Sequence, residues 1–211
     1  MTGVYTITLT TAELLIDKSL TIQGLNANAL IVTRSAAGST PNFRIFNIVT
    51  DVVSPRTISI LGLTISGGNP TSTANEAGGG LLIPVADGSQ VILDGVAVIN
   101  NSAQTGGGIY ASGQGTLTIR NSLIANNTAV SLGPGLADGG GGIQNFANLT
   151  IVNSTISGNS SIRLGGGITT QRPLSLTNVT ITNNRSDTDD SGSNPCGGLC
   201  LFTGPNEVAI Q

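Results

Sequence analysis

The sequence predicts an all-β fold, a right-handed parallel β-helix with three sheets and about six to seven coils. Two recurring phrases predict it. The first is a Gly triplet followed by Leu or Ile, at residues 78–81, 106–109, 140–143 and 165–168, with a degraded copy at 196–199. The second is a pair of short apolar runs around one Gly or Asn, as in LTIVNSTISGN from Leu149. Because both phrases advance together along the chain, the repeat is genuine.

The apolar runs predict short strands, because apolar residues alternate with polar ones at a period of two. Between the two runs of each copy stands a residue that tolerates left-handed backbone, which we expect at a sharp corner. These corner residues are Gly24, Gly62, Gly95, Asn121, Asn153 and Asn178. Strands joined by such corners stack at about 4.8 Å around an apolar interior. Parallel crossovers favour the right-handed form, and the patterns of leucine-rich repeats and propellers are absent.

We expect one domain over residues 1–211, which is a segment of a longer protein. Residues 1–68 form less regular coils, and residues 69–211 form the coils with Gly-Gly-Gly-Ile repeats. Extra residues at 70–77, 129–138 and 186–195 fall just before the Gly runs, so we expect loops on one corner. Loops gathered on one face of a solenoid commonly form its binding surface. An open strand edge at the C-terminal end favours self-association.

The composition excludes some partners. Charged residues make up 9% of the chain and the net charge is −3, with no basic stripe, so nucleic acid is not an expected partner. No apolar run approaches the roughly 18 to 20 residues of a membrane helix, so no membrane insertion is expected. No segment near Met1 resembles a signal peptide. If the protein is secreted, its signal lies outside this sequence.

The phrases GVYTITLTTAELLIDKSLTIQGLNANALIV, RIFNI and ISILGLTISGGN, followed by repeated GGGI and LTIxNSTISGN, carry a family resemblance. The chain resembles bacterial surface β-helix proteins named for a Cys-Ser-Leu-Arg-Glu-Ala motif, although that motif itself is absent. The GGGI phrases are more loosely similar to chlamydial polymorphic outer-membrane proteins. The resemblance implies a right-handed β-helix at the cell surface or outside the cell. It implies no catalytic residues.

Candidate ligand-binding residues are few. Asp187, Asp189 and Asp190 form the densest acidic run, and carboxylates beside Ser and Thr oxygens can hold Ca²⁺. The run lacks the order of a known calcium loop, so a solvated loop is the favoured alternative and no other cofactor is expected. Cys196 and Cys200 either form a local disulfide, typical of an oxidising compartment, or are small apolar residues in a turn.

Other polar residues have structural interpretations. No two acidic residues stack on neighbouring coils, and Asp94 faces Arg120 one coil away, as in a surface ion pair. Several Asn residues match the glycosylation sequon. We expect the stacked corner Asn side chains to form hydrogen-bonded ladders instead.

One outward row has a T-x-T character that is about half filled. Ice-binding solenoids present such flat arrays, whereas Ser and Thr are also ordinary strand surface residues. The row could equally bind a glycan or another cell surface. It includes Thr21, Thr57, Ser59, Thr116, Thr118, Thr150 and Ser175.

The leading functional hypothesis is a non-catalytic, exported scaffold for adhesion, polysaccharide binding or cell-surface structure. The first alternative is a polysaccharide lyase or related carbohydrate-active enzyme, because β-helices host such enzymes. That alternative requires carboxylates, and a basic residue, to converge in one groove. Ice binding is the second alternative, and it requires a flat face without a groove.

Overall fold

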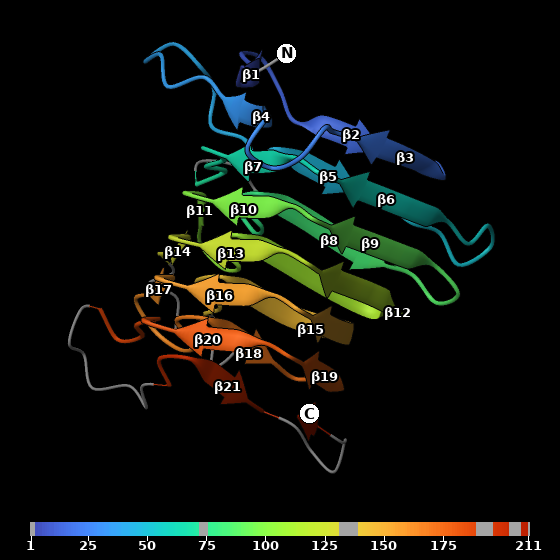
Figure 1. Ribbon diagram of the computed structural model, residues 1–211, viewed down its shortest axis with the longest axis vertical. Coiled ribbons are helices and arrows are strands. Elements are labelled where there is room, and N and C mark those ends of the chain that lie inside the picture. Colours follow the sequence, from blue (N-terminus) through green and yellow to red (C-terminus); the bar gives the residue numbers. More distant parts are fainter. Residues whose placement is uncertain (1–2, 72–75, 131–138, 189–195, 203–207, 211) are drawn as a thin grey trace.

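The computed structural model describes residues 3–71, 76–130, 139–188, 196–202 and 208–210. All of its regular elements are strands (Figure 1). They are β1 (Tyr5–Leu9), β2 (Leu14–Ile16), β3 (Leu20–Gln23), β4 (Leu30–Arg34), β5 (Phe46–Ile48), β6 (Thr57–Leu61), β7 (Thr64–Ser66), β8 (Leu81–Val85), β9 (Gln90–Asp94), β10 (Ala97–Ile99), β11 (Ser102–Ala103), β12 (Ile109–Arg120), β13 (Leu123–Ala125), β14 (Thr128–Ala129), β15 (Ile143–Val152), β16 (Thr155–Ser157), β17 (Ser160–Ser161), β18 (Ile168–Thr170), β19 (Leu174–Thr177), β20 (Thr180–Thr182), β21 (Leu199–Leu201) and β22 (Val208–Ile210).

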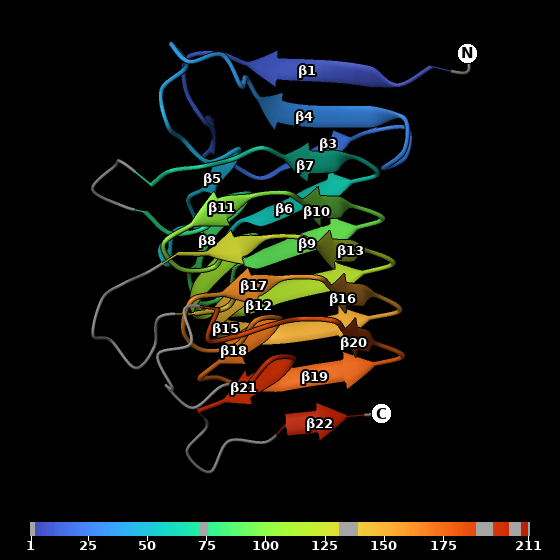
Figure 2. The same cartoon turned by 90° about the vertical axis from the view of Figure 1, so that its left-hand side faces the viewer.

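The strands stack in parallel into columns that run along the molecule (Figures 1 and 2). One face is the seven-stranded sheet β1-β4-β7-β10-β13-β16-β20. The other two faces belong to a twelve-stranded sheet: β2-β5-β8-β12-β15-β18-β21 forms one, and β3, β6, β9, β19 and β22 join the second halves of β12 and β15 in the other. Strand β12 passes from one face to the next where its register with β15 shifts between Ser112 and Thr116. The predicted parallel β-helix with three faces is therefore the observed fold.

The core is a set of aligned apolar columns. Ile60 pairs in register with Leu93, Leu93 with Ile119, and Ile119 with Ile151. All four side chains are fully buried. Side chains at alternate positions point outward, because the strand period is two. In the LTIVNSTISGN phrase, the apolar residues Leu149, Ile151 and Ile156 are all buried.

A short three-stranded sheet, β11-β14-β17, adds a fourth segment to the middle coils. The sequence predicts only three strands per coil, so this sheet is an addition to the prediction. It follows a second corner, at which Asn100 and Asn126 have positive φ values of 55°. After that corner, two residues of each coil extend and pair with the next coil, for example Thr128 with Ser160.

Five of the six predicted corner residues have left-handed backbone. Gly62, Gly95, Asn121, Asn153 and Asn178 have φ values between 47° and 60°. Gly24 does not, so the prediction of a left-handed residue at this corner is wrong. A Cβ atom at Gly24 would overlap the carbonyl oxygen of Gly62 on the next coil. Glycine stands there because two backbones approach closely.

A ladder of buried Asn side chains runs along the inside of the second corner. Asn101 donates from Nδ2 to Oδ1 of Asn127 at 3.0 Å, Asn127 likewise to Asn159 at 2.9 Å, and Asn159 to Asn184 at 2.9 Å. Asn127 and Asn159 are fully buried. The predicted outer ladder also exists, but it is exposed and longer, with 3.5 Å from Asn153 to Asn121 and 3.2 Å from Asn178 to Asn153. The buried ladder therefore contributes more to stability.

Candidate functional site

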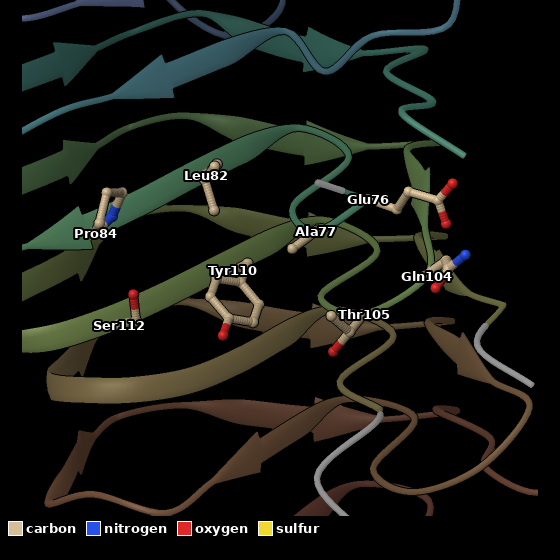
Figure 3. Close-up of a pocket in the computed structure, with 8 residues that line it drawn as sticks. All are labelled: Glu76, Ala77, Leu82, Pro84, Gln104, Thr105, Tyr110 and Ser112. Carbon is tan, nitrogen blue, oxygen red and sulfur yellow. The ribbon is translucent and has the colours of Figure 1, made fainter. Parts of the chain in front are cut away.

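The outward side of the face built from β5, β8 and β12 holds a hollow of about 410 Å³ beside Tyr110, here called the Tyr110 hollow (Figure 3). Leu82, Pro84, Tyr110 and Ser112 reach it from β8 and β12. Glu76, Ala77, Gln104 and Thr105 reach it from the segments that precede the Gly triplets. Figure 3 shows the strand residues on one side and Glu76 and Gln104 on the other.

The aromatic part of this site comes from neighbouring coils. Tyr110 of β12 and Phe146 of β15 have ring centroids 5.7 Å apart with an interplanar angle of 50°. Such tilted pairs are favourable and hold both rings in place. Tyr110 therefore presents a fixed ring to the hollow, with Glu76, Gln104, Thr105 and Ser112 as polar groups around it. An apolar surface with a few polar groups is the usual composition of a small-molecule site.

A second hollow of about 370 Å³ lies nearer the N-terminal end and is here called the Arg44 hollow. Its lining is Thr11, Ala12, Glu13, Pro41, Asn42, Phe43, Arg44, Asn47 and Pro70. The Arg44 side chain is 4% exposed, and its Nε lies 3.4 Å from Oε2 of Glu13. Asn47 donates from Nδ2 to Oε1 of the same carboxylate at 2.7 Å. Burial lowers the pKa of Arg44, and the attraction of Glu13 offsets only part of that effect.

The two hollows share one face of the solenoid. Asn47 of β5 lines the Arg44 hollow and is the register partner of Leu82 of β8, which lines the Tyr110 hollow. Leu82 is in turn the register partner of Tyr110 on β12. Stacked coils lie about 4.8 Å apart. A ligand that extends along the solenoid axis can therefore contact both hollows.

The chemistry available in the Tyr110 hollow is limited. Of the described residues that line it, one is a carboxylate, Glu76, and none is Arg or Lys. Across the described ranges, no three His, Cys, Asp or Glu residues come close enough to hold a metal ion. The arrangement can bind a polar ligand with an apolar face through stacking and hydrogen bonds. Glycoside hydrolysis needs two carboxylates about 5 to 10 Å apart, whereas the described lining of this hollow contributes one.

The structure describes one of the three residues of the predicted calcium site. Asp187 is partly buried and has a φ of 54°. Asp189 and Asp190 lie outside the described residues, so the calcium site stays a prediction. Cys196 and Cys200 are joined by a disulfide, with their Cα atoms 5.5 Å apart.

The polar row lies on the face of β3, β6, β9, β12, β15 and β19. Thr21 pairs with Ser59, Thr118 with Thr150, and Thr150 with Ser175. Ile92 stands between Ser59 and Thr118, and Gln90 between Thr57 and Thr116. The row is aligned but is interrupted on β9.

Asp94 and Arg120 form the expected surface pair, with 2.9 Å between Oδ2 and Nε. Asn121 also donates to Asp94 Oδ1 at 2.9 Å. Partial burial acts to raise the pKa of Asp94, but the contacts with Asn121 and Arg120 outweigh it and leave the pKa below its usual value. This pair lies on the corner beside the polar row, on a different face of the solenoid from the Tyr110 hollow.

Both hollows contain residues that the sequence did not single out. Tyr110 is one of two tyrosines in the chain, and it stands at an outward position two residues after a Gly triplet. An aromatic residue at an outward strand position was the signal that could have indicated it. Glu13, Arg44 and Asn47 carried no such signal, because Glu13 is about thirty residues from the other two in the sequence.

The fold and its outward hollows define a parallel β-solenoid with a candidate binding face. The chain belongs to the right-handed β-helix family, whose model matches residues 56–210. No curated protein and no solved structure matches the chain significantly. Within the described residues, no helix is both long and apolar enough to cross a membrane.

Proposed function

We propose that this chain is a non-catalytic segment of an exported protein that binds a polysaccharide on the outward face of β8 and β12. The single observation behind this proposal is the Tyr110 hollow, in which a ring that packs against Phe146 lies among polar side chains. A sugar ring has an apolar face and a rim of hydroxyl groups, so it matches a site of this composition.

Two further features support the proposal. Glu76 and Ala77 belong to the extra residues 70–77 before a Gly triplet, where the sequence predicts a binding surface. The Cys196–Cys200 disulfide fits a protein that works in an oxidising, extracellular environment. The likeness to bacterial surface β-helix proteins supports the same location.

The test is a glycan array followed by titration calorimetry with the bound glycans. We expect Tyr110→Ala to weaken binding at least tenfold, because the stacking surface is lost. Tyr5→Ala is the matched control, since Tyr5 is the other tyrosine and lies 46% exposed on β1. Equal affinity of the Tyr110→Ala variant and the wild-type chain would contradict the proposal.

The same preparation tests the alternatives. Release of unsaturated sugars from polyuronates would favour the polysaccharide lyase, and inhibition of ice growth would favour the ice-binding solenoid. For ice binding the decisive variant is Thr118→Lys, because Thr118 lies between Ile92 and Thr150 in the polar row. Binding without turnover, lost on substitution of Tyr110, supports the glycan-binding proposal.

A further inference from the structure

We propose that Asp87 is a site of spontaneous covalent modification, at which its peptide bond with Gly88 rearranges to an isoaspartyl bond. The site lies in the turn between β8 and β9, and neither residue lines the two hollows. The inference is independent of the proposed function, because the reaction needs no ligand.

The reaction needs a side-chain carboxyl group beside the backbone nitrogen of the next residue. The nitrogen of Gly88 attacks Cγ of Asp87, so the N–Cγ bond forms, the bond from Cγ to its hydroxyl breaks, and the nitrogen proton leaves with that hydroxyl as water. The product is a five-membered succinimide ring. Water then adds at the backbone carbonyl carbon of Asp87, and the bond from that carbon to the Gly88 nitrogen breaks, which leaves the main chain running through Cβ and Cγ. One water is released and one is taken up, so the reaction requires no oxidant and no other reactant.

The structure brings the reacting groups of this turn together. Asp87 and Gly88 are both exposed, and the nitrogen of Gly88 donates to Oδ1 of Asp87 at 3.0 Å. In the described part of the chain, that nitrogen donates to no carbonyl of a neighbouring coil. Gly88 also has no Cβ atom to shield its nitrogen. A carboxyl group that is already held against the attacking nitrogen reacts faster than one that must first reach it.

A second Asp-Gly step gives an internal comparison. Asp94 and Gly95 stand at the corner between β9 and β10, and the nitrogen of Gly95 donates to the carbonyl oxygen of Arg120 on the next coil at 3.0 Å. Both carboxylate oxygens of Asp94 are also engaged, one by Nε of Arg120 and the other by Nδ2 of Asn121. These contacts favour the ionised carboxylate, which does not release its oxygen as water, so the fold protects Asp94 although the Asp-Gly step is the same. A third such step, Asp138–Gly139, begins outside the described residues.

Isomerisation would change the turn itself. The nitrogen of Ser89 donates to the carbonyl oxygen of Ala86 at 3.0 Å and closes the turn, and Oγ of the buried Ser89 accepts from the nitrogen of Arg56 at 3.0 Å. An extra carbon in the main chain would lengthen the turn between Ala86 and Ser89. Because β8 lies on the face of the Tyr110 hollow and β9 on the face of the polar row, the altered turn joins these two faces.

The experiment incubates the full chain in water enriched in heavy oxygen at about pH 5, where a part of ordinary Asp carboxyl groups is protonated. Each passage through the succinimide introduces a heavy oxygen atom at that residue, and electron-transfer fragmentation of peptides locates the label and the isoaspartyl bond. We expect the label to enter Asp87 at least about tenfold faster than Asp94 in the folded chain. In urea the two rates should become similar, because both steps then lie in an unfolded chain. Asp87→Glu is the control and should abolish the label at this position, because the longer side chain would have to close a six-membered ring.

The comparison of the two Asp-Gly steps decides the proposal. Equal rates at Asp87 and Asp94 in the folded chain, or faster labelling of Asp94, would overturn it. Labelling of Asp87 in urea alone would also overturn it, since the folded turn would then protect this residue as the corner protects Asp94.

Discussion

The N-terminal coils and the Gly-triplet coils build the same three-faced solenoid by different means. From β8 to β18, backbones pack through Gly triplets, and the Asn101–Asn184 ladder fills the inner corner. In residues 3–68, larger side chains occupy the corresponding space: Phe43, Ile45 and Phe46 are buried, and Arg44 is buried beside Glu13.

This difference indicates which coils of a repeat protein can form a site that the other coils lack. Gly triplets leave little room, since a Cβ atom at Gly107 would overlap the backbone of Thr128. Where the repeat is irregular, side chains from distant segments meet and leave open volumes. The Arg44 hollow is lined mainly by the irregular coils. The Tyr110 hollow is lined by residues of the first two Gly-triplet coils and of the segments that precede their triplets.

The largest expected effect comes from a buried charge in each region. Ile119→Asp places a carboxylate in the dry core and should cost about 4 kcal/mol or more of unfolding free energy. Ile22→Asp should cost about half as much, because Ile22 is only partly buried at the first coil. Chemical denaturation followed by circular dichroism measures both. Equal costs would show that the first coil is as well packed as the middle ones.

The Asn ladder provides the next test. Asn127→Ala removes a side chain that donates to Asn159 and to the Val98 carbonyl and accepts from Asn101. We expect a loss of about 3 kcal/mol, because several buried groups lose their partner. Asn126→Gly is the matched control at the neighbouring exposed corner, with a change within about 0.5 kcal/mol. Similar melting temperatures for the two variants would show that the buried ladder adds no more stability than the exposed corner beside it.

The smallest effect concerns Asp94, whose position in the preceding coil is taken by Leu61. The folded-state pKa of Asp94 lies below its usual value, so the ionised carboxylate stabilises the fold above about pH 4. This contribution is lost as the pH falls through the folded-state pKa. Asp94→Asn should therefore destabilise the chain by less than about 1 kcal/mol at about pH 7 and by almost nothing at about pH 2. A destabilisation that persists in acid would mean that packing, not charge, is responsible.

Much of the fold could be predicted because its cause is local. The strands follow from apolar residues that alternate with polar ones over a few positions. The corners follow from a single Gly or Asn between two strands, as at Gly62, Gly95, Asn121 and Asn153. Gly24 shows the limit of that reasoning. Its glycine is required by a contact with Gly62 on the next coil, which the residue type alone cannot distinguish from a left-handed turn.

The candidate binding face could not be predicted in the same way. Glu76 and Tyr110 are distant in sequence, and so are Glu13 and Arg44, and they meet only after the coils have stacked. The lengths of the loops determine which side chains lie beside which strands. The repeat pattern in the sequence does not predict these lengths. The buried ladder was missed for a related reason: Asn126 and Asn127 look alike in sequence, but only Asn127 points inward.

The ladder also gives the solenoid a mechanical direction. Its side-chain bonds from Asn101 to Asn184, like the backbone bonds between coils, join one coil to the next. A pull along the solenoid axis loads these bonds in series, so the weakest junction opens first and the remaining coils stay folded. For a protein that holds a surface under tension, this amounts to a stepwise release, one coil at a time, in place of a single rupture.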